Sequence, residues 1–180
     1  MITFVYNVYS FMLIIYVLQK IEQKFCTIIL QPIRLYELLF FLPIYFLKLN
    51  LFAYLVLSSL FTLAWMDTRL KEVSHRLLSV YFIMIFIHYI NNPLPINTIS
   101  LFICLALYGF SYLTNGLGLG DVYIYFGLSF ILTLSDFLTV FRYSLWIALF
   151  VELIKKTKTS FAFIPYIYIG LILFLTLNLY

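Results

Sequence analysis

Long apolar runs, separated by short polar stretches, constrain this chain of 180 residues more than any other feature. Hydrophobic residues make up 65% of the sequence and charged residues 10%, whereas soluble globular chains carry about 25% charged residues. A segment in lipid must satisfy its own backbone hydrogen bonds, and a helix does so without a partner. We therefore predict an all-α fold, a polytopic transmembrane helical bundle.

Eight apolar segments predict about eight helices in one membrane-embedded domain that covers residues 1–180. The segments are 3–18, 35–47, 51–66, 77–90, 96–113, 122–135, 138–154 and 161–178. Several are shorter than the roughly 20 residues that a helix perpendicular to the membrane needs. Glu37 and Pro43 interrupt the second segment, so this segment either spans the membrane or lies at its surface.

Basic residues predict the orientation. If the N-terminus is outside, the inner loops hold Lys20, Lys24, Arg34, Arg69, Lys71, Arg76, Lys155, Lys156 and Lys158. The outer side then keeps Lys48 and Arg142. Because lysine and arginine concentrate in cytoplasmic loops, we expect both termini outside and a multi-pass location in the cell (cytoplasmic) membrane. The net charge of +4 then indicates contact with the lipid bilayer and not with nucleic acid.

Two of the seven acidic residues lie at the predicted inner ends of apolar runs. Asp67 directly follows the run 51–66, and Asp121 directly precedes the run 122–135. Carboxylates at membrane depth are costly and are candidates for function. Two neighbouring carboxyls share a proton, so the ionised one can draw a proton from water while the protonated one donates to the leaving group. The alternative is that each aspartate caps a helix or pairs with a nearby base.

Glycines occupy alternate positions before Asp121, at Gly116, Gly118 and Gly120. At the start of a helix they allow close backbone approach and unusual dihedral angles; the alternative is an ordinary flexible loop. A phosphate-binding loop is disfavoured, because no Gly-Lys-Ser/Thr follows. Gly118, Gly120 and Asp121 resemble the Gly-x-Gly-Asp motif of membrane-embedded aspartic proteases.

Three further stretches resemble motifs of the type IV prepilin peptidase family. The stretch from Asp67 to Leu77 is similar to the family's other aspartate motif, with Val73 where isoleucine is usual. Residues 34–44 are similar to its Trp-Tyr-Glu-Leu-Ile-Pro-Ile stretch, and residues 163–166 to its entry into the last helix. The match runs in order through nearly the whole chain. It is closest to the short members that serve competence pseudopili in Gram-positive bacteria.

The resemblance implies a membrane aspartic endopeptidase. Such an enzyme removes the short basic leader from prepilin-like (pseudopilin) substrates at the cytoplasmic face of the membrane. Asp67 and Asp121 would be the catalytic pair, and Gly118 and Gly120 would shape the site. Glu37 would contact the basic leader of the substrate. The implied partners are the prepilin-like protein and the lipid bilayer; no cofactor is expected, and no oligomeric state is predicted.

The cysteine content departs from the family pattern. Full-length members carry two Cys-x-x-Cys pairs in an inner loop, associated with zinc and with N-methylation of the cleaved substrate. Here only Cys26 lies near that place, so residues 19–50 look like a reduced remnant of the Cys-containing cytoplasmic loop region. This departure argues against methyltransferase activity. Cys26, Cys104, His75 and His88 lack the spacing of a zinc site, so no metal is expected.

Two other functions stay open. Intramembrane proteases of the presenilin or signal-peptide-peptidase type also use Gly-x-Gly-Asp, but Asp67 lies in a basic loop region and Pro165 lacks a Pro-Ala-Leu context. A non-enzymatic member would be a pilus-assembly membrane scaffold or a small cation-coupled transporter that uses Asp67 and Asp121. Ser74, where the family has proline, and Tyr123, where lysine is common, leave room for an inactive member.

Overall fold

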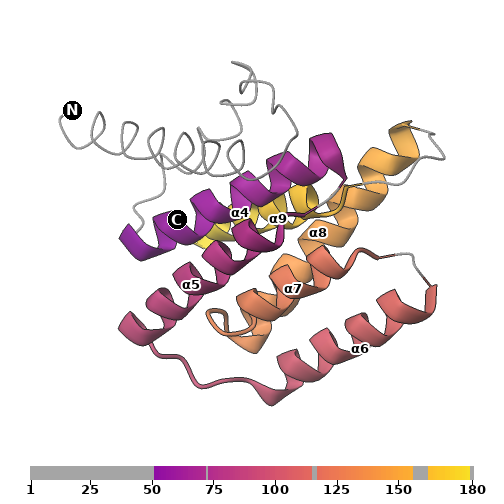
Figure 1. The fold of residues 1–180 in the computed structure, drawn as a ribbon. Coiled ribbons are helices and arrows are strands. Elements are labelled where there is room, and N and C mark those ends of the chain that lie inside the picture. Colours follow the sequence, from indigo (N-terminus) through magenta and orange to yellow (C-terminus); the bar gives the residue numbers. More distant parts are fainter. Residues whose placement is uncertain (1–50, 72, 115–116, 156–161, 179–180) are drawn as a thin grey trace.

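The computed structural model describes residues 51–71, 73–114, 117–155 and 162–178. Within these ranges the chain forms helices and no strand (Figure 1). The helices are α4 (Leu51–Leu70), α5 (His75–Asn91), α6 (Thr98–Thr114), α7 (Leu119–Leu128), α8 (Leu134–Lys155) and α9 (Ile164–Asn178).

Helix α9 lies at the centre of the packing, with α4, α7 and α8 all in contact with it. More than half of its residues are buried, while Leu173 and Leu177 are exposed. Helix α7 also contacts α5 and α6, and α6 lies at the edge of the molecule (Figure 1). The first turn of α9 is therefore held against both α4 and α7.

A glycine sets the distance between α8 and α9. A Cβ atom on Gly170 would lie 2.6 Å from Ser144 Oγ and 2.9 Å from Ser144 N, so no larger residue fits without separating the two helices. The Ser144 hydroxyl donates to Val140 O at 2.7 Å, which satisfies it within α8. Small residues at a crossing let two backbones approach closely, and this contact holds the middle of α9 against α8.

The predicted polytopic transmembrane bundle of about eight helices, with both termini outside, is wrong. The described residues contain six helices, and one of them, over Leu134–Ile154, is long and apolar enough to cross a membrane by length and composition. Three more apolar helices are shorter: Thr98–Leu113, Leu119–Leu128 and Ile164–Asn178. At 1.5 Å per residue α7 is about 15 Å long, half of a hydrocarbon core of about 30 Å. Apolar composition did not separate helices that pack within the protein from helices that match the thickness of a membrane.

The segment predicted at 122–135 is divided in the structure. Helix α7 ends at Leu128, and α8 begins at Leu134. Thr133 donates its hydroxyl proton to Asp136 Oδ2 at 2.6 Å, while Asp136 N donates to Thr133 Oγ1 at 3.3 Å. This reciprocal cap starts a new helix inside an apolar run. The predicted segments 3–18 and 35–47 and the proposed loop remnant 19–50 lie outside the described residues.

Candidate functional site

The carboxylate of Asp67 meets the start of α9. Asp67 stands in the last turns of α4 and is 8% exposed. The Ile164 N–H donates to its Oδ2 at 3.1 Å, and the Phe163 N–H donates a second hydrogen bond. The first N–H groups of a helix have no partner within the helix, and the helix dipole favours an anion there. Asp67 therefore caps α9, a helix 97 residues further along the chain.

The turn after Asp67 directs the chain towards α7. Lys71 N donates to Asp67 O at 3.0 Å, and Lys71 adopts a φ of 54°, the left-handed conformation that commonly ends a helix. The positive charge of Lys71 also acts on the Asp67 carboxylate. Val73 and Ser74 then lead into α5, and Val73 packs against the hydrophobic core.

The carboxylate of Asp121 folds back on the start of its own helix. Asp121 lies in the first turn of α7 and is 6% exposed. Its Oδ2 accepts a hydrogen bond from Gly118 N at 3.0 Å, and its own N–H donates to Gly118 O at 3.1 Å. An acidic side chain at the third helical position often satisfies the backbone N–H of the N-cap residue in this way. Both aspartates are thus helix caps, which is the alternative that the sequence had left open.

The two motif glycines occupy places where a side chain would collide. A Cβ atom on Gly120 would lie 2.8 Å from Val73 Cγ2 and 3.8 Å from Ile164 Cδ1. A Cβ atom on Gly118 would lie 3.1 Å from Asp121 Oδ2. Glycine at 120 therefore lets the first turn of α7 lie against the turn that follows α4 and against the start of α9. Glycine at 118 leaves room for the Asp121 carboxylate.

The carboxyls of Asp67 and Asp121 lie within electrostatic range of each other. Burial, and after it the negative charge of Asp67, raises the pKa of Asp121 to about 7, against the hydrogen bond from Gly118. Burial also raises the pKa of Asp67, opposed by the hydrogen bonds from Ile164 and Phe163 and by Lys71. Both carboxyls stand just outside the apolar runs 51–66 and 122–135. Two neighbouring carboxyls with raised pKa values can share a proton, which is what general acid–base chemistry needs.

The sequence-predicted site residues therefore divide into two groups. Asp67, Asp121, Gly118 and Gly120 come together at one place, where the ends of α4, α7 and α9 meet, although their catalytic role stays a prediction. Glu37, the candidate for leader binding, lies outside the described residues. In the described ranges, no group of three or more His, Cys, Asp or Glu side chains is arranged to hold a metal ion.

The contribution of α9 to the site was not predicted. The donors to Asp67 are backbone N–H groups, so the side chains at 163 and 164 carry no signature of this contact. Pro165 is the available signal, because proline favours the first turn of a helix and marks where free N–H groups begin. A second hydrogen bond holds this turn: the Tyr166 hydroxyl donates to Glu152 Oε1 of α8 at 2.8 Å.

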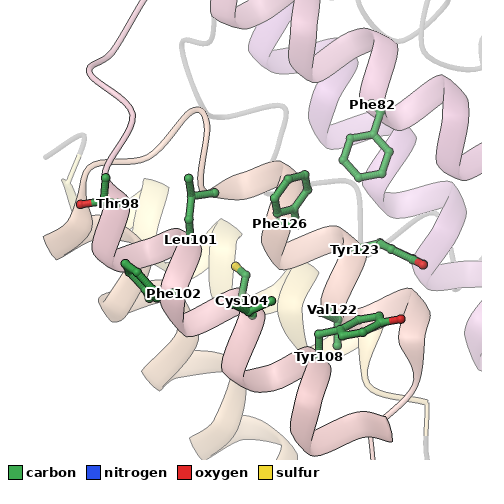
Figure 2. A pocket seen from close by; sticks show the side chains of 10 residues that line it. Phe82, Thr98, Leu101, Phe102, Cys104, Tyr108, Val122, Tyr123 and Phe126 are labelled. Carbon is green, nitrogen blue, oxygen red and sulfur yellow. The ribbon is translucent and has the colours of Figure 1, made fainter.

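An apolar pocket of about 630 Å³ lies between α5, α6 and α7 (Figure 2). It is lined by Phe82, Thr98, Leu101, Phe102, Cys104, Leu105, Tyr108, Val122, Tyr123 and Phe126. Val122 and Tyr123 directly follow Asp121 in α7. None of the described residues that line the pocket is charged.

Three chain segments that are distant in sequence thus converge on two buried carboxyls, and the pair can exchange a proton with a water molecule and with a leaving group. Comparison of the chain with family models, with curated proteins and with solved structures gives no match in any of the three.

Proposed function

We propose that this chain is an aspartic endopeptidase in which Asp67 and Asp121 activate water for hydrolysis of a peptide bond. The observation that carries the proposal is the pairing of two buried carboxyls from α4 and α7, where burial, and after it the negative charge of Asp67, raises the pKa of Asp121 to about 7. An isolated aspartate is ionised near pH 7, so it has no proton to donate. The pair combines a proton acceptor and a proton donor at the same pH.

The substrate that fits best is a prepilin-like protein, with a short basic leader followed by an apolar helix. This part of the proposal rests on the resemblance of the stretches 67–77, 118–121 and 163–166 to motifs of the type IV prepilin peptidase family. Support comes from geometry: Val73 and Ile164, from two of these stretches, both pack where Gly120 of the third has no side chain. The reaction needs no cofactor, and N-methylation is not part of the proposal.

The cell membrane is the proposed location, with the carboxyl pair at the cytoplasmic face. Helix α8 is long and apolar enough to cross a membrane, and we propose that it anchors the chain in the lipid bilayer. Large apolar side chains are exposed along α6 and α8, far beyond the scattered apolar residues of a soluble surface. They are Phe102, Leu105, Phe110, Leu113, Leu145, Trp146, Leu149, Phe150, Leu153 and Ile154.

A second candidate is a non-enzymatic membrane scaffold for pilus assembly. The observation in its favour is that Asp67 and Asp121 both cap helices, a role that a purely structural aspartate also fills. The two candidates differ in one measurable property. A scaffold would leave the leader of a prepilin-like protein in place, whereas a peptidase would remove it.

Co-expression with a prepilin-like protein tests the proposal. The substrate should carry a short basic leader, one apolar helix and a C-terminal tag, so that leader loss appears as a faster-migrating band. We expect the mature band only when the chain is present, and mass spectrometry should place the new N-terminus between the leader and the apolar helix. A panel of such substrates that all stay full-length would favour the scaffold.

A further inference from the structure

The two carboxyls stand in unequal surroundings. Asp67 accepts two backbone N–H hydrogen bonds from the first turn of α9 and lies within range of the positive charge of Lys71. Helix α9 has 15 residues, and the N–H groups at its start are oriented towards the carboxylate. Each of these interactions is stronger with an ionised carboxylate than with a neutral carboxylic acid.

Asp121 has less to stabilise a negative charge. It accepts one backbone hydrogen bond, from Gly118 at 3.0 Å, and the neighbouring charge that acts on it is the negative charge of Asp67. It is as deeply buried as Asp67. Burial and a nearby like charge both favour the neutral, protonated form of a carboxyl.

We infer that the roles within the pair are fixed, with Asp67 as the general base towards water and Asp121 as the holder of the shared proton. This inference rests on the proposed peptidase function and deepens it, because it assigns a protonation state to each carboxyl at the start of the reaction. The start of α9, far from Asp67 in sequence, then sets the direction of proton transfer. Phe163 and Ile164 act through their backbone N–H groups as positioning residues.

The assignment gives a balanced reaction. Asp67 takes a proton from water as the water oxygen attacks the carbonyl carbon, and Asp121 gives its proton to the carbonyl oxygen, which forms a neutral gem-diol. Asp67 then passes its proton to the amide nitrogen and the C–N bond breaks. One gem-diol hydroxyl returns a proton to Asp121 as the carboxylic acid product forms. The pair ends in the protonation state in which it began.

Other titratable and charged groups surround the pair. Lys71 acts on Asp67 from the end of α4, and Tyr125 of α7 lies within electrostatic range of Asp121. His75 and Arg76 are exposed at the start of α5. On α9, the Tyr166 hydroxyl is hydrogen-bonded to Glu152 of α8. Because the positive charge of Lys71 acts on Asp67, it reinforces the difference between the two aspartates.

A titration that needs no substrate tests the assignment. The chain contains three aspartates, Asp67, Asp121 and Asp136, so a variant with two of them changed to Asn carries one. With carbon-13 aspartate, infrared spectra report the protonation of that single carboxyl in the full-length protein. We expect Asp121, alone after Asp67→Asn and Asp136→Asn, to lose its proton at least one pH unit above Asp67, alone after Asp121→Asn and Asp136→Asn. The reverse order, or the same titration midpoint for both, would overturn the assignment.

A backbone change tests the role of α9 in catalysis. Replacing the Ile164 amide by an ester, through cell-free synthesis with the matching hydroxy acid, removes the N–H that binds Asp67. We expect the acidic limb of kcat/KM against pH to move up by about one pH unit, with the alkaline limb unchanged. The matched control is the same ester at Ile167, whose N–H donates within the helix to Phe163 O.

The outcomes separate the two proposals. An Ile164 ester that moves the alkaline limb, moves neither limb, or behaves as the Ile167 ester does would overturn the assignment while leaving the peptidase intact. A wild-type chain that cleaves no prepilin-like substrate would instead remove the proposed function. The infrared titration would then still decide which aspartate holds the proton.

Discussion

At the scale of single residues, Asp67 and Asp121 each have a structural role, as a helix cap, in the same atoms to which we assign the proposed chemistry. In each aspartate, one carboxyl oxygen accepts a hydrogen bond from a backbone N–H at the start of a helix. The same carboxyl also lies within range of the negative charge of the other aspartate. Capping is therefore compatible with the proposed acid–base chemistry. The backbone N–H groups hold the carboxyls in place, and burial favours the protonated form of a carboxyl.

Asp67→Asn and Asp121→Asn should each abolish leader cleavage. Asn keeps the size of Asp and an oxygen that accepts the backbone hydrogen bond, but it neither takes nor supplies a proton. The measurement is the fraction of a tagged prepilin-like substrate that reaches mature length at equal enzyme levels in the membrane. Asp136→Asn is the control and should stay within a few-fold of wild type, because Asp136 caps α8 with Thr133. Near-normal cleavage by Asp67→Asn would contradict the assignment of the pair.

Asp121→Asn should also stabilise the protein at high pH. Folding raises the pKa of Asp121 from 3.8 to about 7. This group therefore contributes to the free energy of unfolding at low pH. That contribution is lost as the pH rises from about 4 through about 7. Asn is neutral at every pH, so the free energy of unfolding of Asp121→Asn should exceed that of the wild type by an amount that grows to about 2–4 kcal/mol over this pH window. Thermal unfolding at pH 4.5 and pH 8 measures it. A pH-independent effect of Asp121→Asn would contradict the raised pKa of Asp121.

At the scale of elements, the sequence indicated where helices occur more reliably than where they end. Each apolar segment predicted after residue 50 corresponds to a helix, but the break at 129–133 lies inside an unbroken apolar run without proline. The signal that was missed is local: Thr133 and Asp136 have the spacing of a capping box. The contact between α9 and Asp67 has no such signal, because it joins a side chain to backbone groups 97 residues away.

Gly120→Leu should inactivate the enzyme by separating the elements that carry the pair. The new side chain would begin 2.8 Å from Val73 Cγ2, so α7 must move away from the turn after α4 and from the start of α9. Overpacking of this kind lowers the free energy of unfolding by about 1–3 kcal/mol. Because Asp121 would be displaced from Asp67, the rate of cleavage should fall at least tenfold. Cleavage of the tagged substrate and thermal unfolding measure both effects.

The chain offers a matched control for this substitution. Gly109 lies within α6, and a Cβ atom there would have no neighbour within 4 Å. Gly109→Leu adds the same side chain to the same residue type and should leave cleavage near the wild-type rate. Equal losses from the two substitutions would show that the close approach at Gly120 is not what the site depends on.

At the scale of the whole molecule, composition predicted an apolar, helical protein, but it did not predict how many helices are long enough for a membrane. The reason is that apolar residues serve two environments. Those of α9 face other helices, with Ile164, Ile167 and Leu171 almost fully buried, whereas those of α8 that include Trp146 and Phe150 are exposed. Both helices are apolar in sequence, and the packing shows which apolar residues face other helices and which are exposed.

The two ends of α8 should be reached from opposite sides of the membrane. Glu152 bonds to Tyr166 in the first turn of α9, which places that end of α8 on the side of the Asp67–Asp121 pair. Ser135 is exposed at the other end, roughly 25 Å away at 1.5 Å per residue. His75, also exposed, begins α5 on the side of the pair. In a chain with Cys26→Ser and Cys104→Ser, Ser135→Cys should react with an impermeant thiol reagent in intact cells, and His75→Cys only after the membrane is opened. Labelling of His75→Cys in intact cells, or extraction of the chain from membranes by alkaline carbonate, would contradict a site at the cytoplasmic face.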